Sequence, residues 1–204
     1  MTTDPTVLAL VCTLKSSPAE SSSDLITRQL LDEFAAAGVQ GTALRPVDAD
    51  IRPGVQTDMG GGDEWPGIRE QVLAADILLI ATPTWLGHMS SVAQRVLERL
   101  DAELSETDDA GRPSMVGKVA VSAVVGNEDG AHKIIADLTQ ALDDIGFTIP
   151  AQGGTYWNGA AMSGTDYKDL AETPEAVRST NAALVRNATH LARLLRAQPY
   201  PPYR

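Results

Sequence analysis

The sequence predicts a three-layer α/β sandwich around a five-stranded parallel sheet, and two patterns support this fold class. Three short runs, residues 7–12, 77–81 and 119–125, are apolar almost throughout. Such runs suit strands that are covered by helices on both faces. Between them, apolar residues recur about every 3.6 positions, which is typical of amphipathic helices. Because strands and helices alternate, right-handed crossovers would place the helices on both faces of one sheet.

Each expected element has a local signal. The strands, of which the second and fifth are expected at the sheet edges, are residues 7–12, 42–45, 77–81, 119–125 and 147–150. The proline at position 150 favours an edge because it cannot donate a ladder hydrogen bond. The helices are expected to begin at Ser23-Asp24, to span 66–74, 92–100 and 134–145, and to begin again at Thr173-Pro174-Glu175.

The rest of the chain consists of connections and a tail. Residues 48–64 and 105–114 are polar and rich in turn formers, so we expect surface excursions rather than linkers. We therefore expect one domain over residues 1–204, with an extended proline-rich tail at 198–204 that lies over a partner subunit.

Composition excludes several classes of protein. The chain has 16 Lys and Arg against 27 Asp and Glu, and its net charge of −11 argues against nucleic-acid binding. A single cysteine, Cys12, excludes an intrachain disulfide, a four-cysteine zinc site and a self-sufficient iron–sulfur cluster. No apolar run approaches the ~18 residues of a membrane span, and the first residues do not resemble a signal peptide. We expect a cytoplasmic protein with no membrane partner and no metal.

In an open parallel sheet, ligands bind at the carboxyl ends of the strands, where the strand order reverses. For the order 2-1-3-4-5, this point joins the loops at residues 13–23, 82–91 and 126–132. The first loop offers hydroxyls, one lysine and a helix N-terminus, which together suit an anion. Its candidate phosphate ligands are Thr13, Lys15, Ser16, Ser21, Ser22 and Ser23. The alternative is a serine-rich loop in which one serine only caps the helix.

The first loop lacks both Gly-x-Gly-x-x-Gly and Gly-x-x-x-x-Gly-Lys-Ser/Thr, so a mononucleotide is favoured over a dinucleotide or a triphosphate. In the second loop, a planar ligand could pack on Trp85, although the ring could instead plug the loop against its own helix. In the third loop, Asn127 and backbone amides could bind a heterocycle edge. There the alternative is a plain turn in which Asp129 caps the next helix.

Taken together, these loops resemble flavodoxin-like flavoproteins of the NAD(P)H-dependent FMN reductase and WrbA-type quinone oxidoreductase branch. The strongest similarity is Ala81-Thr82-Pro83-Thr84-Trp85-Leu86-Gly87-His88-Met89-Ser90-Ser91, followed by Gly126-Asn127-Glu128-Asp129-Gly130 and Gly153-Gly154-Thr155-Tyr156-Trp157. The resemblance implies a flavodoxin-like three-layer sandwich with FMN as cofactor and NADPH or NADH as electron donor. It also implies that the first loop holds the FMN phosphate. The residues implied at the flavin ring are Pro83, Thr84, Trp85, Leu86, Gly87, His88, Met89, Gly126, Asn127, Glu128, Asp129 and Gly130.

One departure from flavodoxins proper is that the phosphate loop is longer than Thr-x-Thr-Gly-x-Thr and carries Lys15. The resemblance further implies a homodimer or homotetramer that completes the flavin pocket across an interface. The flavin ring would carry out the chemistry, so no catalytic side chain is expected. We therefore predict an FMN-dependent NAD(P)H oxidoreductase that reduces a quinone, a flavin or another small acceptor.

The sequence leaves two other functions open and excludes a third. An acidic electron carrier of flavodoxin type remains open, as does a module that has lost its flavin. A CheY-like receiver is excluded, because it needs an acidic pair, an aspartate and a lysine where this chain has Thr13-Leu14, Thr82-Pro83 and Gln152.

Several single residues also remain open. His88 and His132 could touch the ring or be solvated. Trp65 suits a substrate wall or a hydrophobic staple, and Tyr156 and Trp157 suit a flavin cover or a subunit contact.

Overall fold

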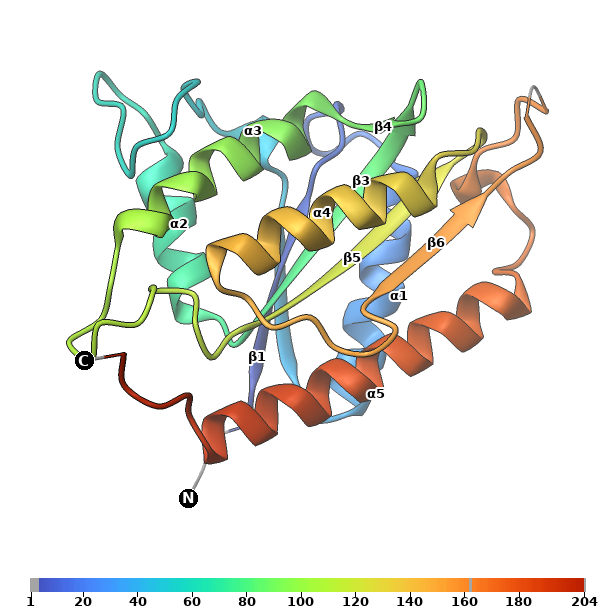
Figure 1. The fold of residues 1–204 in the computed structure, drawn as a ribbon. Helices are drawn as coiled ribbons and strands as arrows, with labels where there is room; N and C mark the ends of the chain where they lie inside the picture. The colour runs from blue at the N-terminus through green and yellow to red at the C-terminus, as the bar shows by residue number, and fades with distance from the viewer. Residues whose placement is uncertain (1–3, 162, 204) are drawn as a thin grey trace.

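The computed structural model describes residues 4–161 and 163–203. Five parallel strands form its central sheet (Figure 1): β1 (Thr6–Val11), β2 (Gln40–Leu44), β3 (Ile77–Trp85), β5 (Val119–Gly126) and β6 (Gly154–Asn158). Their spatial order is β2-β1-β3-β5-β6, and the short β4 (His88–Met89) pairs antiparallel with β3. The predicted fold class and the 2-1-3-4-5 order of the five parallel strands are confirmed.

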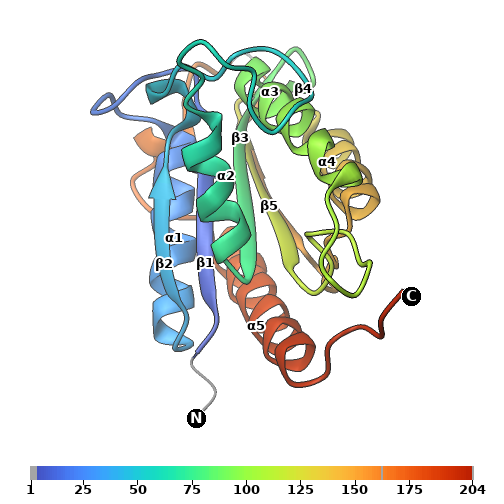
Figure 2. The same ribbon diagram turned by 90° about the vertical axis from the view of Figure 1, so that its left-hand side faces the viewer.

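Helices cover both faces of this sheet (Figures 1 and 2). Successive side chains of a strand point to opposite faces, so alternate residues of β1 enter two separate cores. Leu8 and Leu10 pack with α2 (Trp65–Ala74), α3 (Ser91–Leu100) and α4 (Ala131–Ile145). Val7 and Ala9 pack on the other face with α1 (Ser22–Ala36) and α5 (Glu175–Ala197).

The prediction for the fifth strand is wrong. In residues 147–150, Thr148 forms only an isolated parallel bridge to Val119, and its backbone bonds to Lys118 and Ala120. The chain then turns through Pro150 and through Gln152, whose φ is +56°. The edge strand begins after this turn, so the Gly153–Trp157 stretch that we expected behind the last strand largely forms β6.

The N-cap of α1 lies two residues before the predicted Ser23. The helix begins at Ser22 and its N-cap is Ser21, so Ser23 lies inside the first turn together with the acidic Asp24. All three serines therefore stand at the helix N-terminus.

A buried ion pair holds the surface segment at residues 48–64 against α3. This segment begins at the end of the 3-10 helix η1 (Pro46–Asp48). Arg99 of α3 lies 2.7 Å from the fully buried Asp63 carboxylate and donates to the backbone oxygens of Arg52 and Gln56. Burial by itself would raise the pKa of Asp63, but hydrogen bonds from Arg99 and from backbone N–H groups hold it well below its usual range. The guanidinium also lies 5.6 Å from the buried Trp65 ring, so Trp65 is a core residue and not a substrate wall.

The C-terminal tail packs on its own chain. Arg112 donates to the Tyr200 carbonyl, the Tyr200 hydroxyl lies 3.1 Å from that of Thr148, and the Tyr203 amide donates to Ala110. These contacts cover the segment after η2 (Asp101–Ser105). The last residue of the predicted tail, Arg204, lies outside the described residues.

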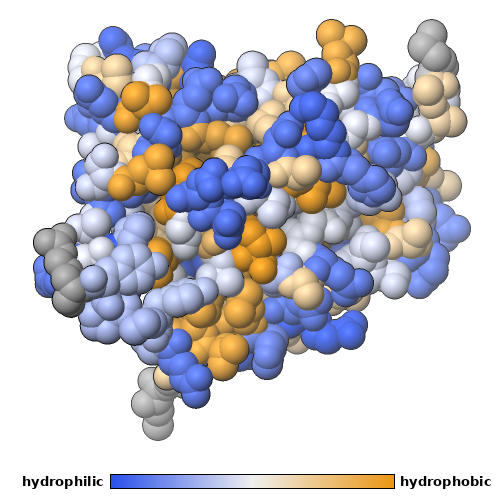
Figure 3. Space-filling model, in the orientation of Figure 1, coloured by the Kyte–Doolittle hydropathy of each residue, from blue (hydrophilic) through white to orange (hydrophobic). Residues whose placement is uncertain are grey.

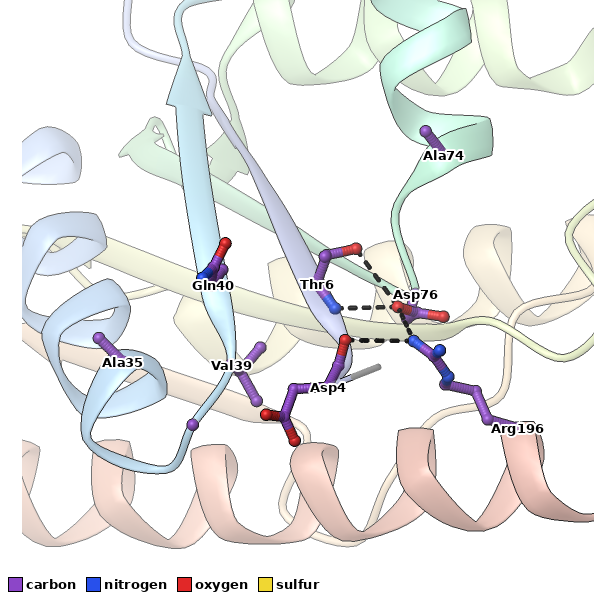
Figure 4. A pocket seen from close by; sticks show the side chains of 9 residues that line it. Asp4, Thr6, Ala35, Val39, Gln40, Ala74, Asp76 and Arg196 are labelled. Carbon is purple, nitrogen blue, oxygen red and sulfur yellow. Dashed lines mark hydrogen bonds and ion pairs between the residues drawn. The ribbon is translucent and has the colours of Figure 1, made fainter. Parts of the chain in front are cut away.

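The amino ends of the strands are joined by a polar cluster beside an open cavity of about 980 Å³ (Figure 4). Asp76, just before β3, accepts hydrogen bonds from the Thr6 amide and hydroxyl and from Arg196 of α5. Arg196 also donates to the Asp4 carbonyl. The cluster therefore ties β1 and β3 to the last helix.

Candidate functional site

A cavity of about 210 Å³ lies at the opposite end, where the carboxyl ends of β1, β3 and β5 meet. Six segments contribute to it, and the residues that line it are Thr13, Leu14, Lys15, Ser21, Ser22, Ser23, Pro83, Thr84, Trp85, Val125, Gly126, Asn127, Trp157, Asp166, Tyr167 and Lys168. The cavity therefore occupies the switch point that the strand order predicts.

The start of α1 gives this cavity free hydrogen-bond donors. Leu25 is the first residue whose amide bonds back within the helix, to the Ser21 carbonyl. The preceding amides, of Ser22, Ser23 and Asp24, have no intrahelical partner, as at every helix N-terminus. The Ser23 side-chain hydroxyl is also buried, at 1% residue exposure, and has no hydrogen-bond partner among the described residues. Amides, a hydroxyl and the helix dipole thus point to an anion at one spot.

A second unpartnered hydroxyl comes from the end of β3. Thr84 is 5% exposed, and its Oγ1 has no hydrogen-bond partner among the described residues. It stands against Gly126 of β5, where an added Cβ would lie 2.7 Å from the Thr84 Cβ. Glycine at position 126 is therefore required for this close approach. A buried hydroxyl without a partner costs about 1–3 kcal/mol, which a polar ligand would recover.

Ser90 fixes the β1 and β3 loops to each other. Its amide donates to the Thr82 hydroxyl, and its own hydroxyl donates to the Cys12 carbonyl at 2.6 Å. The same oxygen accepts from the Ala93 amide and so caps α3. Cys12 itself is buried just after β1, and burial raises the pKa of its thiol, which agrees with a filler role.

The turn at residues 85–88 is tightly built. Leu86 has a φ of +50°, its amide donates to the Glu128 carboxylate, and its carbonyl lies 2.7 Å from His88 Nδ1. Gly87 contacts Gly130, where a Cβ would come within 2.7 Å of the Gly87 Cα. These contacts join the second and third loops, although none of the five residues that make them lines the cavity.

The predicted site residues therefore fall into two groups. The cavity brings together Thr13, Lys15, Ser21, Ser22, Ser23, Pro83, Thr84, Trp85, Gly126 and Asn127. It is not lined by Ser16, Leu86, Gly87, His88, Met89, Glu128, Asp129 or Gly130. Met89 is half-buried and packs against the core that contains residues of α3 and α4. The Ser16 carbonyl accepts a hydrogen bond from the Ala19 amide and so closes a turn.

Residues 166–168 complete the cavity, and the sequence did not predict them. Asp166 accepts from the Asn127 side chain at 3.1 Å, and the Lys168 amide donates to the Ser22 hydroxyl at 3.3 Å. The Tyr167 ring packs against that of the wall residue Trp157, with centroids 5.5 Å apart and ring planes tilted by 47°. The 3-10 helix η3 (Tyr167–Asp169) is thus held over the site. A lone aromatic in a polar stretch was its only sequence signal.

The two aromatics left open by the sequence have different places. Trp157 lines the cavity, whereas Tyr156 points to the other face of β6 and meets His132 edge-on, with its hydroxyl 3.0 Å from His132 Nε2. The strand alternation therefore assigns only Trp157 to this cavity.

The charge of the cavity lining differs from that of the whole chain. Lys15 and Lys168 line it together with one carboxylate, Asp166, although the protein carries a net charge of −11. Lys15 donates to the Glu20 carbonyl, and a hydrogen bond to Asp169 raises the pKa of Lys168. The Lys168 amine is therefore cationic at neutral pH, and the two lysines beside a single carboxylate favour an anionic ligand.

Two further observations bear on chemistry and location. Within residues 4–161 and 163–203, no group of three or more His, Cys, Asp or Glu side chains is placed to hold a metal ion. In the same part of the chain, no helix is both long and apolar enough to cross a membrane.

The chain is similar in sequence to several known proteins. The family model described as NADPH-dependent FMN reductase matches residues 5–161. The 8-demethyl-8-aminoriboflavin-5'-phosphate synthase of Streptomyces davaonensis is 30% identical over 95% of this chain and 79% of its own length. A "divalent metal cation transporter MntH" of Mycobacterium bovis is 36% identical over 93% of this chain, which spans only 29% of that protein.

Solved structures show the same relationship. The crystal structure of RosB with bound 8-demethyl-8-formylriboflavin-5'-phosphate has a TM-score of 0.87 at 30% identity, covering 96% of this chain and 82% of RosB. An NADH:FMN oxidoreductase, EMOB, has a TM-score of 0.65 at 18% identity, covering 97% of this chain and 94% of its own, and shares the fold.

Proposed function

Because the chain belongs to the NADPH-dependent FMN reductase family, we propose that its carboxyl-end cavity binds FMN and that the holoprotein passes reducing equivalents from NAD(P)H to a small acceptor. The observation that carries the proposal is the pair of buried, unpartnered hydroxyls of Ser23 and Thr84 in one cavity. A quinone and a free flavin are the acceptor classes of this proposal.

The phosphate of FMN belongs at the start of α1 in this proposal. Amides of the first helical turn and the hydroxyls of Ser21, Ser22 and Ser23 would bind its oxygens, with Thr13 beside them. Lys15 and Lys168 would balance its charge.

The ring belongs between the β3 and β5 loops. Trp85, which is 55% exposed, and Trp157 offer aromatic surfaces, while Thr84 and Asn127 offer polar contacts near the close approach at Gly126. The cofactor would accept and release the hydride, and the protein would position it.

The size of the cavity implies an adjustment of its cover. Its volume of about 210 Å³ lies below the roughly 300–1,000 Å³ of sites for ligands of this class. Two groups assigned to FMN, the Ser22 hydroxyl and the Asn127 amide, bond to Lys168 and Asp166 of the cover. We therefore expect Asp166 and Lys168 to give up these bonds when FMN binds.

The proposal is tested with purified protein that is incubated with excess FMN, desalted and mixed with NADPH without oxygen. We expect a retained flavin spectrum that bleaches on addition of NADPH. Retained flavin that NADPH cannot bleach would indicate an electron carrier instead, and loss of all flavin on desalting would refute the cofactor site.

A second candidate function follows from the similarity to RosB, whose structure holds a modified riboflavin 5'-phosphate. In that function, FMN would be a substrate that leaves chemically altered. Mass spectrometry of the flavin after turnover separates the two. We expect unaltered FMN, and a product modified on the ring would favour the second candidate.

We also propose that residues 1–204 act as one domain and assemble as a homodimer or homotetramer. On the face in Figure 3, apolar and hydrophilic residues are interspersed. The exposed Leu86 and Trp85, beside the cavity mouth, are the apolar residues that we assign to a subunit contact. Light scattering with Leu86→Asp tests this assignment, and we expect the variant to dissociate.

A further inference from the structure

The loop at residues 13–21 is held from outside the cavity by Arg45, at the end of β2. The guanidinium donates to the Ala19 carbonyl at 2.7 Å and to the Lys15 carbonyl at 3.3 Å. It also pairs with Asp24 in the first turn of α1 at 3.3 Å. Only 9% of the Arg45 side chain is exposed, so it is packed against the protein and not extended into solvent.

Asp48 of η1 holds the middle of the same loop. Its two carboxylate oxygens accept from the Ser17 amide at 2.8 Å and from the Ser17 hydroxyl at 2.6 Å. The Ser17 bonds also lower the pKa of Asp48, so the carboxylate stays charged at neutral pH. Arg45 and Asp48 therefore bind three points of the loop, and we call this pair the brace.

The brace decides which backbone groups the loop can offer to a ligand. A phosphate is bound by N–H donors, while a carbonyl oxygen that faced it would repel it. The brace ties the carbonyls of Lys15 and Ala19 to a cation that does not line the cavity. A loop that is already folded also saves the ordering cost that binding would otherwise pay.

We propose that Arg45 and Asp48 are positioning residues that set the shape of the phosphate loop before FMN arrives. The inference rests on the proposed function, because it assigns these two residues to the affinity for the 5'-phosphate of the flavin. It makes one specific claim: the brace raises affinity for FMN and leaves affinity for riboflavin, which has no phosphate, unchanged.

The test measures the dissociation constants of FMN and of riboflavin for the full chain, by titration of flavin fluorescence. We expect Arg45→Gln to weaken FMN by about tenfold, because charged hydrogen bonds that order the loop are lost. Riboflavin should change less than about twofold. The matched control is Arg28→Gln, which removes the same charge and the other ion-pair partner of Asp24, 2.8 Å away, without contact to the loop. This control should leave the ratio of FMN affinity to riboflavin affinity unchanged.

Two more variants separate loop shape from charge. Arg45→Lys keeps the charge but loses the planar fork, so FMN affinity should stay low, and full rescue by lysine would overturn the inference. Asp48→Asn leaves Arg45 in place and should also lower the ratio of FMN affinity to riboflavin affinity. This variant provides the test if Arg45→Gln does not fold. An unchanged ratio in the brace variants, or an equal loss in Arg28→Gln, would also overturn it. If the wild-type chain binds no FMN, the proposed function fails. If the wild-type chain binds FMN and the brace variants bind it equally tightly, only the brace fails.

Discussion

The two ends of the sheet both carry a polar cavity, but they use their polar groups differently. At the amino end, Asp76 accepts hydrogen bonds from the Thr6 amide, the Thr6 hydroxyl and Arg196 (Figure 4). At the carboxyl end, the hydroxyls of Ser23 and Thr84 are buried without a partner among the described residues. The amino-end cavity has the larger volume, about 980 Å³ against about 210 Å³.

Under the proposed function, the smaller cavity is the ligand site, so cavity volume would be a poor guide to it. Polar groups that satisfy one another stabilise the fold, whereas buried groups without partners are costly and persist where a ligand completes them. Polar residues of the first kind should therefore affect stability alone. Those of the second kind that line the cavity should affect stability and FMN affinity in opposite directions, whereas those outside it should affect stability alone.

The largest effect is expected at Asp63, a carboxylate outside the cavity that is paired with Arg99 and accepts backbone hydrogen bonds. Asp63→Asn breaks the buried pair with Arg99, which should lower the free energy of unfolding by about 3–5 kcal/mol. Urea unfolding measures the loss, and flavin titration of the folded fraction should give an unchanged dissociation constant. A drop in FMN affinity as large as the drop in stability would break the comparison.

The acid stability of the wild-type protein should depend on the same carboxylate. The pKa of Asp63 is lowered in the folded protein, so its contribution is complete above the unfolded value of about 3.9. It is lost as pH falls from there through the folded pKa. Unfolding followed from pH 6 to pH 2 should show a steep decline below about pH 4, and Asp63→Asn should show a shallower one.

A smaller loss is expected at the amino end. Asp76→Ala leaves the Thr6 amide and Arg196 with fewer acceptors, which should cost about 1–3 kcal/mol of stability. Thermal unfolding measures this cost. FMN affinity should be unchanged. A weakening above about threefold would indicate that FMN binds at the amino end of the sheet and would contradict the comparison.

The smallest effect is the most specific. Thr84→Val removes an unpartnered buried hydroxyl and should raise stability by about 1 kcal/mol while weakening FMN by about tenfold. Thr189→Val on α5 is the matched control, because Thr189 Oγ1 is equally buried and unpartnered but lies outside the cavity. It should raise stability to a similar extent and leave FMN affinity unchanged. Equal effects of both variants on FMN would remove the distinction.

Most of the fold could be predicted because its central strands are strong local signals. β1, β3 and β5 are buried on both faces and read as continuous apolar runs. β6 has no such run, since an edge strand of Gly-Thr-Tyr-Trp-Asn is small and polar in part. The β-branched residues at 148–149 gave the stronger signal, but Pro150 and the turn at Gln152 end pairing there.

The three loops of the site followed from topology, whereas their cover did not. Strand order alone places residues 13–23, 82–91 and 126–132 at one edge. Residues 166–168 reach the same place through single contacts, such as Asp166 to Asn127 and Lys168 to Ser22. No local pattern encodes contacts between residues 39 positions apart or more. The brace residues Arg45 and Asp48 were missed for the same reason.

Hydrogen–deuterium exchange with and without FMN tests the central claim most directly. We predict that FMN slows exchange in residues 13–23, 82–91, 126–132 and 166–168, and that the amino-end segments around Asp4, Val39 and Asp76 do not change. Riboflavin should protect the same segments except 13–23. Protection by FMN at the amino-end cavity, or at neither end, would contradict the account.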